Sequence, residues 1–136
     1  MTDKELISLA KKAAVKAYVP YSGYTVGAAL LCKDEKVYLG CNIENAAYSP
    51  TNCAERTAFF KAVSEGEREF TGIAVVGGKD GDFKEYFAPC GVCRQVMMEF
   101  CDKDFYILMG KNGDEYKKVT LEELLPFAFS SDNIRD

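Results

Sequence analysis

Histidine and tryptophan are both absent from this sequence of 136 residues, and proline occurs only four times. Without histidine, the chain cannot form a Ser-His-Asp or Cys-His nucleophile system, a histidine proton shuttle, or a zinc site that needs an imidazole ligand. Long hydrophobic runs are also missing, since no segment approaches the roughly 18 apolar residues of a membrane-spanning helix. Any chemistry must therefore come from Cys, Asp, Glu, Lys, Tyr and Arg side chains.

The chain has no excess of positive charge either. Lys and Arg total 17 and Asp and Glu total 21, which gives a net charge of −4. Because proteins that bind long nucleic acids need clustered cations to release the counterions of the phosphates, we expect no nucleic-acid partner. The length and an ordinary globular composition predict a single domain over residues 1–136.

The amino terminus contains no recognisable targeting signal. Its charged residues lead into an apolar run that is too short for a secretory signal peptide. We therefore expect a cytoplasmic protein without membrane attachment, in which thiols stay reduced. In that compartment, clustered cysteines bind metal more often than they form disulfides. The six cysteines are Cys32, Cys41, Cys53, Cys90, Cys93 and Cys101.

Hydrophobic periodicity and turn residues predict alternating helices and strands. The predicted helices cover residues 3–18, 53–65, 90–101 and 121–125, and the predicted strands cover residues 26–32, 37–41, 70–76, 105–109 and 116–119. Polar residues between the first two strands predict an antiparallel hairpin, and the Gly- and Asp-rich segment 77–88 predicts a loop. This order predicts an α/β fold, a three-layer α/β/α sandwich around a mixed five-stranded sheet.

Three cysteines occupy positions suited to a metal. Cys53 begins one predicted helix, and Cys90 and Cys93 have C-x-x-C spacing at the start of the next. The unpaired N–H groups and positive dipole end of a helix N-terminus stabilise thiolates. If the two helices follow adjacent strands, their N-termini meet at one edge of the sheet. Three thiolates there would hold a zinc ion with its fourth position open, as in catalytic sites.

Spacing alone leaves other possibilities open. A C-x-x-C pair after a strand is also typical of thioredoxin-like redox proteins. A fourth cysteine would instead close a structural zinc site, which could serve a module for protein contacts. Cys32, Cys41 and Cys101 lie among apolar residues, and we expect them to be buried free thiols.

Glu55 favours the catalytic zinc site. It follows Cys53 by two residues, on the same helical turn but on a different face, so it can approach the open position without being a ligand. Zinc lowers the pKa of a bound water, and a carboxylate beside that water can accept its proton and later pass it to a leaving group. The alternative role for Glu55 is an acidic residue that stabilises the first turn of a helix.

These motifs resemble a known family. The segments Cys53-Ala54-Glu55 and Pro89-Cys90-Gly91-Val92-Cys93-Arg94-Gln95 resemble the zinc signature of the cytidine deaminases. Further segments that are similar to the small homotetrameric nucleoside enzymes of this family are 20–24, 26–30, 40–49 and 123–126. The similarity therefore extends from the first predicted helix to the C-terminus.

The resemblance implies a role for each matching residue near the metal. Cys53, Cys90 and Cys93 would hold one zinc ion per subunit, and Glu55 would be the proton shuttle. Three thiolates and Zn²⁺ carry a net charge of −1, which a nearby cation is expected to offset. Arg56 would do so by donating to the ligand sulfurs.

The resemblance also implies the substrate contacts. Asn42 and Glu44 match the ribose-binding pair, and Tyr24 matches an aromatic residue, usually Phe, that packs on the pyrimidine. The backbone around Ala54 would contact the edge of the base. Phe129 matches an aromatic residue contributed by a neighbouring subunit.

Subunit contacts would complete each pocket. Ala46 and Tyr48 would line it near such a contact, so the homotetramer would have composite active sites. Phe127 departs from the family by standing where a small residue is common, so it competes with Phe129 for the stacking role. The segment 77–86 is longer than usual, and the Tyr24 hydroxyl needs a partner.

The activity implied is zinc-dependent hydrolytic deamination of cytidine and 2′-deoxycytidine to uridine and 2′-deoxyuridine, with release of ammonia, in pyrimidine salvage. The nearest alternative is a deaminase of a related nucleoside such as blasticidin S. The pair Asn42-x-Glu44 favours a substrate with a ribose. A structural zinc or interaction module is the non-enzymatic alternative.

Overall fold

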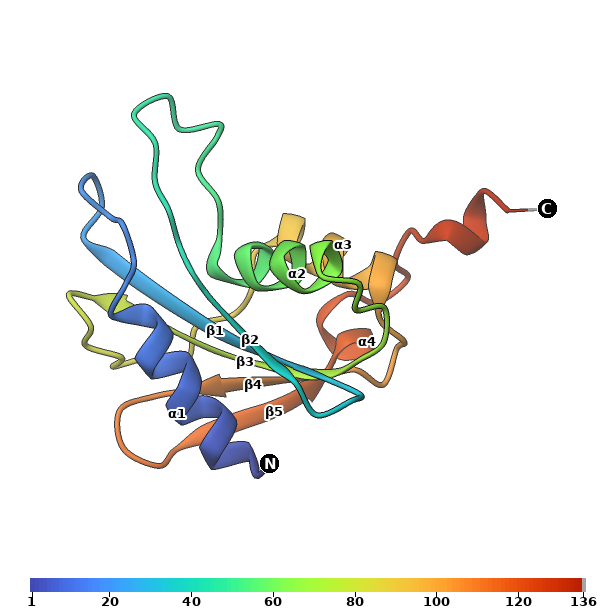
Figure 1. The fold of residues 1–136 in the computed structure, drawn as a ribbon, viewed down its shortest axis with the longest axis horizontal. Helices are drawn as coiled ribbons and strands as arrows, with labels where there is room; N and C mark the ends of the chain where they lie inside the picture. Colours follow the sequence, from blue (N-terminus) through green and yellow to red (C-terminus); the bar gives the residue numbers. More distant parts are fainter. Residues whose placement is uncertain (136) are drawn as a thin grey trace.

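A mixed five-stranded sheet lies at the centre of the protein (Figure 1). The computed structural model describes residues 1–135. In their order across the sheet, the strands are β2 (Val37–Cys41), β1 (Tyr24–Cys32), β3 (Phe70–Lys79), β4 (Tyr106–Gly110) and β5 (Tyr116–Thr120). Within the described residues, β3 and β4 are parallel and the other three neighbouring pairs are antiparallel.

Helices cover both faces of this sheet. The helix α1 (Asp3–Ala14) packs on one face, and α2 (Ala54–Ser64) and α3 (Gly91–Phe100) pack on the other (Figure 1). The short α4 (Leu121–Leu124) follows β5 directly, and a 3₁₀ helix covers Ser131–Asn133. The predicted three-layer sandwich around a mixed five-stranded sheet is confirmed. No helix within residues 1–135 is both long and apolar enough to span a membrane.

Alternation along the strands divides the core between the two faces. In β1, Ala28 and Leu30 pack with the cluster under α2 and α3, whereas Ala29 and Leu31 pack with the cluster under α1. Successive side chains of a strand point to opposite faces, so each central strand contributes to both clusters. Burial on both faces explains why these strands are continuous apolar runs.

Two glycines allow the helices to approach the sheet closely. A Cβ atom on Gly27 would lie 2.0 Å from the carbonyl oxygen of Ala10 in α1, and one on Gly40 would lie 2.3 Å from the carbonyl oxygen of Ala54 in α2. Because a Cβ cannot stand that close to backbone, only glycine fits at either position. The contact at Gly40 places the first turn of α2 directly on β2.

The first helix is shorter than predicted. It ends at Ala14, whereas the periodicity predicted a helix as far as residue 18. The backbone of Tyr18 pairs instead with a distant segment: its N–H donates to Asn42 O at 3.0 Å, and its carbonyl accepts from Glu44 N at 2.9 Å. The prediction for residues 15–18 was wrong because a long-range pairing overrides a local helical pattern.

The third strand is longer than predicted. It continues beyond residue 76 to Lys79, since Gly77–Lys79 pairs with Tyr24–Val26 of β1. The first residues of the predicted loop 77–88 are therefore strand. Asn112, in the β4–β5 turn, holds the remaining connection: its N–H donates to Phe83 O at 2.8 Å, and its Oδ1 accepts from Phe83 N at 3.1 Å.

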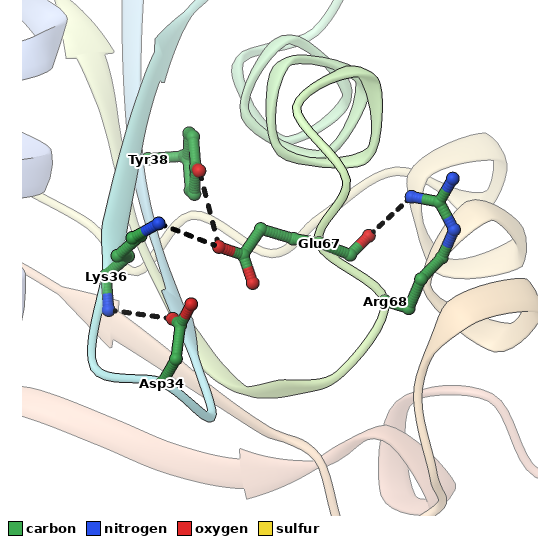
Figure 2. Close-up of polar contacts among 5 residues, drawn as sticks. All are labelled: Asp34, Lys36, Tyr38, Glu67 and Arg68. Carbon is green, nitrogen blue, oxygen red and sulfur yellow. Dashed lines mark hydrogen bonds and ion pairs between the residues drawn. The ribbon is translucent and has the colours of Figure 1, made fainter.

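A polar cluster ties the β1–β2 turn to the connection between α2 and β3 (Figure 2). The Glu67 carboxylate accepts from the Tyr38 hydroxyl at 3.4 Å and lies 4.0 Å from the Lys36 ammonium. The backbone N–H of Lys36 donates to Asp34 at 3.1 Å. We call these four residues, together with the buried Cys32 beside them, the hairpin cluster.

Candidate metal centre and active site

Two helix N-termini bring the predicted metal ligands together. Cys53 is the N-cap of α2 and Cys90 is the N-cap of α3, with Cys93 in the first turn of α3. These helices follow β2 and β3, which are not adjacent strands, because β1 lies between them. Both strands run antiparallel to β1, so they point the same way and their ends reach the same edge of the sheet.

The three thiols fit a zinc ion. Their Sγ atoms all lie within 4.8 Å of one another, and the Sγ atoms of Cys53 and Cys90 are 3.8 Å apart. Tetrahedral zinc with Zn–S bonds of about 2.3 Å separates its ligand sulfurs by about 3.8 Å. Cys90 Sγ accepts only a long contact from Cys93 N at 3.4 Å, and Cys53 makes no cap hydrogen bond with its side chain. The sulfurs are therefore available to a metal.

Arg56 is the cation of this cluster. Its guanidinium donates from Nη2 to Cys53 Sγ at 3.1 Å. Although burial opposes it, hydrogen bonding to Cys53 and Cys93 raises the pKa of Arg56 above its ordinary value. The pKa of the Cys53 thiol falls to about 5, chiefly because Cys93 donates a hydrogen bond to it, with Arg56 adding to the effect. The Cys53–Cys93 pair therefore shares one thiolate charge beside Arg56, with the pKa of Cys53 lowered and that of Cys93 raised.

Glu55 is the only charged residue among those buried in residues 1–135, with 1% of its surface exposed. Neither carboxylate oxygen has a hydrogen-bond partner there. Burial, with a smaller contribution from the nearby Cys53 charge, raises the pKa of Glu55 to about 7. A buried polar group without partners costs stability and points to a functional role. A carboxyl with a pKa near neutrality can both accept and donate a proton.

Asn42 and Glu44 lie where the end of β2 passes the start of β1. The Asn42 side chain acts as an extra rung of the sheet: it donates to Tyr24 O at 2.8 Å and accepts from Val26 N at 3.0 Å. The Glu44 carboxylate accepts from the backbone N–H groups of Tyr21 and Ser22, each at 3.1 Å, and from the Ser22 hydroxyl. The Ser22 hydroxyl in particular holds the pKa of Glu44 below its usual value, so Glu44 is ionised.

Tyr24 is partly exposed and has an aromatic neighbour. Its ring centroid lies 6.0 Å from that of Phe87, which precedes the C-x-x-C motif. The Ala54 residue is fully buried at the first position of α2. Asn42 is hydrogen-bonded to Tyr24 at the start of β1. Ala54 instead lies next to Cys53, at the end of the site where the three sulfurs meet, which we call the metal end.

The predicted subunit-contact residues lie on segments that project from the fold. Tyr48 is 75% exposed and lies with Glu44 on the wall of a cavity of about 400 Å³. Ala46 belongs to the same long β2–α2 connection, which extends well beyond the sheet (Figure 1). Phe129 is 60% exposed and lies on the C-terminal segment, which leaves the fold in another direction (Figure 1). One chain alone does not bring these two projections together. Phe127, the competitor for stacking, is fully exposed.

Several residues of the site were not assigned by sequence reasoning. Phe87 carried no local signal, because its contact with Tyr24 joins two distant segments. Arg94 and Gln95 lie inside the recognised motif but had no assigned role. Arg94 donates to Pro89 O at 2.7 Å and to Leu124 O at 2.6 Å, and Gln95 donates to Phe129 O at 2.9 Å. These two side chains attach the C-terminal segment to α3.

Three thiols at two helix N-termini, with a buried carboxyl beside them, are the features of a zinc deaminase. The chain belongs to the cytidine and deoxycytidylate deaminase family: the model of the cytidine and deoxycytidylate deaminase zinc-binding region matches residues 1–109. It is similar to the cytidine deaminase of Halalkalibacterium halodurans, with 50% identity over 136 residues and 100% of both chains. It is also similar to the cytidine deaminase of Sporosarcina psychrophila, with 50% identity over 98% of this chain and 96% of that relative.

Solved structures agree with these relatives. A crystal structure of cytidine deaminase from Burkholderia pseudomallei matches with a TM-score of 0.88 and 46% identity, covering 95% of this chain and 100% of that chain. A blasticidin-S deaminase of Bacillus cereus is a more distant relative, with 30% identity over 94% of this chain and 92% of its own length.

Proposed function

We propose that this chain hydrolyses cytidine and 2′-deoxycytidine to uridine and 2′-deoxyuridine, with release of ammonia. The observation that carries the proposal is the unpartnered, buried Glu55 carboxyl beside three thiols that fit zinc. The names of the relatives at 50% identity support the same reaction. In this reaction a C4–O bond forms with the oxygen of water, and the C4–N bond to the amine breaks.

The residues at the metal end of the site have separate roles. Cys53, Cys90 and Cys93 would hold zinc, which supplies Lewis-acid activation of the hydrolytic water. Glu55 accepts the first proton from that water and delivers it to N3 of the base. It then takes the second proton from the hydroxyl now bonded to C4 and transfers it to the amine, so that the C4–N bond breaks, the C4 carbonyl forms and ammonia leaves. A pKa near 7 suits both directions of transfer, and burial keeps competing water away from the carboxyl. Arg56 stabilises the sulfurs by its hydrogen bond to Cys53.

The sugar and base would contact the other end of the site. Glu44 is ionised and held on one side by the Tyr21–Ser22 segment, so its remaining lone pairs are available to ribose hydroxyls. Asn42 is fixed by β1 in the same region. Tyr24 offers a partly exposed ring to the pyrimidine, and the backbone at Ala54 offers polar groups to the edge of the base.

Two assays separate this proposal from its alternatives. Zinc content and the loss of ultraviolet absorbance on cytidine should both be measured on the purified chain, with blasticidin S as a second substrate. We expect bound zinc and faster turnover of cytidine than of blasticidin S. Zinc without turnover of either compound would indicate a structural module. A chain without zinc, in which Cys90 and Cys93 cycle between thiol and disulfide, would indicate a redox protein.

We also propose that residues 1–136 form a single domain that assembles into a homotetramer with composite active sites, acting in cytoplasmic pyrimidine salvage. The exposure of Tyr48 and Phe129 on separate projections supports the composite site. Phe129→Ala should raise the KM with zinc unaffected, since stacking on a base contributes about 1–3 kcal/mol.

Mixed oligomers test the composite site directly. Oligomers of Glu55→Gln and Phe129→Ala chains should regain activity, because some sites then combine an intact Glu55 with an intact Phe129. Phe127→Ala chains keep both Glu55 and Phe129, so mixing them with Glu55→Gln chains should reveal no such rescue. An active monomer, or a fully competent Phe129→Ala chain, would contradict the composite site.

A further inference from the structure

We propose that Lys79, the last residue of β3, is a positioning residue for sugar recognition that orients Glu44 through the backbone of Ser22. The inference rests on the proposed ribose-binding role of Glu44. Lys79 contacts neither the three sulfurs nor the substrate in this proposal, and acts on the sugar only through Ser22 and Glu44.

The Glu44 carboxylate lies in a cradle made by one short segment. Backbone N–H groups of Tyr21 and Ser22 both donate to its Oε1, each at 3.1 Å, and the Ser22 hydroxyl donates to its Oε2. Successive N–H groups that converge on one carboxylate fix its orientation. The Ser22 hydroxyl in turn accepts from Tyr24 N at 3.0 Å, which fixes its own direction. The direction of the lone pairs that remain on Glu44 therefore depends on where this segment lies.

The end of β3 holds that segment from the opposite side. The Lys79 ammonium donates to Ser22 O at 2.8 Å, and the N–H of Asp80 donates to Gly23 O at 2.9 Å. Gly23 has a left-handed backbone with a φ of 67°, and a Cβ atom on it would lie 3.0 Å from the Lys79 Nζ. The tight turn at Gly23 therefore exposes the Ser22 carbonyl to Lys79. Pairing of Tyr24 with Lys79 in the sheet register keeps the two segments together.

The charge of Lys79 strengthens a chain of hydrogen bonds. The peptide group whose oxygen accepts from Lys79 also donates, through Gly23 N, to Val19 O at 3.0 Å. A charged donor at one end of such a chain polarises the next bond, so both become stronger. Within residues 1–135, Lys79 forms no ion pair within 4.0 Å, and its ammonium is available to the Ser22 carbonyl. Lys79 therefore links the extended end of β3 to the Glu44 cradle.

Steady-state kinetics of Lys79→Met test this role. Lys79 is exposed, so the variant should fold and keep its zinc. We expect the KM for cytidine to rise about three- to tenfold, as for the loss of one ordinary hydrogen bond, because Lys79 acts on the sugar site only indirectly, with kcat unchanged. Lys79→Arg should restore the KM, because it keeps a charged donor. Lys84→Met is the matched control: Lys84 lies five residues further on, in the β3–α3 connection, and pairs with Asp82 at 3.5 Å. The KM of Lys84→Met should stay at the parent value.

Two further measurements separate this role from a general loosening of the fold. For a cytidine analogue without the 2′- and 3′-hydroxyls, Lys79→Met should leave the KM unchanged. In a Glu44→Gln background, Lys79→Met should cause no additional rise in the KM for cytidine. An equal rise for both substrates, or an undiminished rise in the Glu44→Gln background, would overturn the proposal.

The same series distinguishes the two possible failures. If Glu44→Gln raises the KM for cytidine but Lys79→Met does not, the role of Lys79 is wrong and the proposed function stands. If Glu44→Gln itself leaves the KM unchanged, the ribose-binding role of Glu44 is wrong, and the inference falls with it.

Discussion

Two clusters of this protein are alike in the spacing of their donor atoms. The sulfurs of Cys53, Cys90 and Cys93 lie within 4.8 Å of one another. In the hairpin cluster, the sulfur of Cys32 and carboxylate oxygens of Asp34 and Glu67 meet the same limit. Distance alone would assign a metal to both.

Their surroundings separate them. In the first cluster, hydrogen bonds from Cys93 and Arg56 lower the pKa of Cys53 to about 5, so a thiolate is ready for a metal. In the hairpin cluster, burial and the neighbouring carboxylates raise the pKa of Cys32 to about 12, and Lys36 lies 4.0 Å from Glu67. Metals bind deprotonated ligands. The first cluster already holds one thiolate charge beside the Arg56 guanidinium, although the pKa of Cys93 is raised, whereas the Cys32 thiol of the hairpin cluster is protonated. A thiolate that is already formed, more than donor spacing, distinguishes the two clusters.

The largest expected difference comes from removing one sulfur from each cluster. Cys90→Ala should lose both bound zinc and cytidine turnover, because two thiolates are too few to hold the ion. Cys32→Ala, its matched control, should keep zinc and turnover near the parent values. Metal analysis and the ultraviolet assay measure both. Stoichiometric zinc in Cys90→Ala, or loss of zinc in Cys32→Ala, would contradict the assignment of zinc to the three sulfurs.

A carboxyl from each cluster gives the next test. Glu55→Gln should keep its zinc but lose about 10²–10⁴-fold in turnover, since proton transfer by a positioned side chain contributes that much. Glu67→Gln should leave turnover unchanged, because the Glu67 carboxylate belongs to the hairpin cluster, where it contacts Tyr38 and Lys36. Near-normal turnover of Glu55→Gln would remove this residue from the mechanism.

The cations provide a smaller difference. Arg56→Gln should lower zinc affinity or activity by about 10–100-fold, the usual effect of removing a group that hydrogen-bonds a metal ligand. Lys36→Gln should change neither zinc affinity nor activity, although it removes the cation that lies 4.0 Å from Glu67 in the hairpin cluster. Competition with a zinc chelator, followed by the ultraviolet assay, measures both quantities. Equal sensitivity of the two variants would show that Arg56 does not act on the sulfurs.

The last comparison concerns the sugar end of the site, where the effect falls on the KM alone. Glu44→Gln should raise the KM for cytidine about tenfold or more, since a hydrogen bond to a charged partner contributes roughly 1.5–3 kcal/mol. Asp34→Asn, which alters an acidic side chain of the hairpin cluster, should leave the KM unchanged. Free cytosine should be a poor substrate of the parent enzyme. Turnover of cytosine as fast as cytidine would contradict the ribose contact.

Features that depend on local sequence were predictable, and features that depend on long-range pairing were not. The C-x-x-C spacing and the position of Glu55 after Cys53 identified the metal end, because both lie within one helical turn. The predicted end of the first helix was wrong because Tyr18 pairs with the segment from Asn42 to Glu44. The aromatic contact of Phe87 with Tyr24 likewise joins distant parts of the chain. The resemblance supplied roles for Asn42, Glu44 and Phe129 that no local pattern indicates.

X-ray absorption at the zinc edge of the purified chain tests most directly whether three thiolates hold a catalytic zinc ion. A catalytic site of this kind should give three sulfur scatterers at about 2.3 Å and one oxygen at about 2.0–2.2 Å, the signature of an open site. Four sulfurs would indicate a closed structural site. A shell dominated by oxygen, as the hairpin cluster would supply, would place the metal elsewhere and contradict the account.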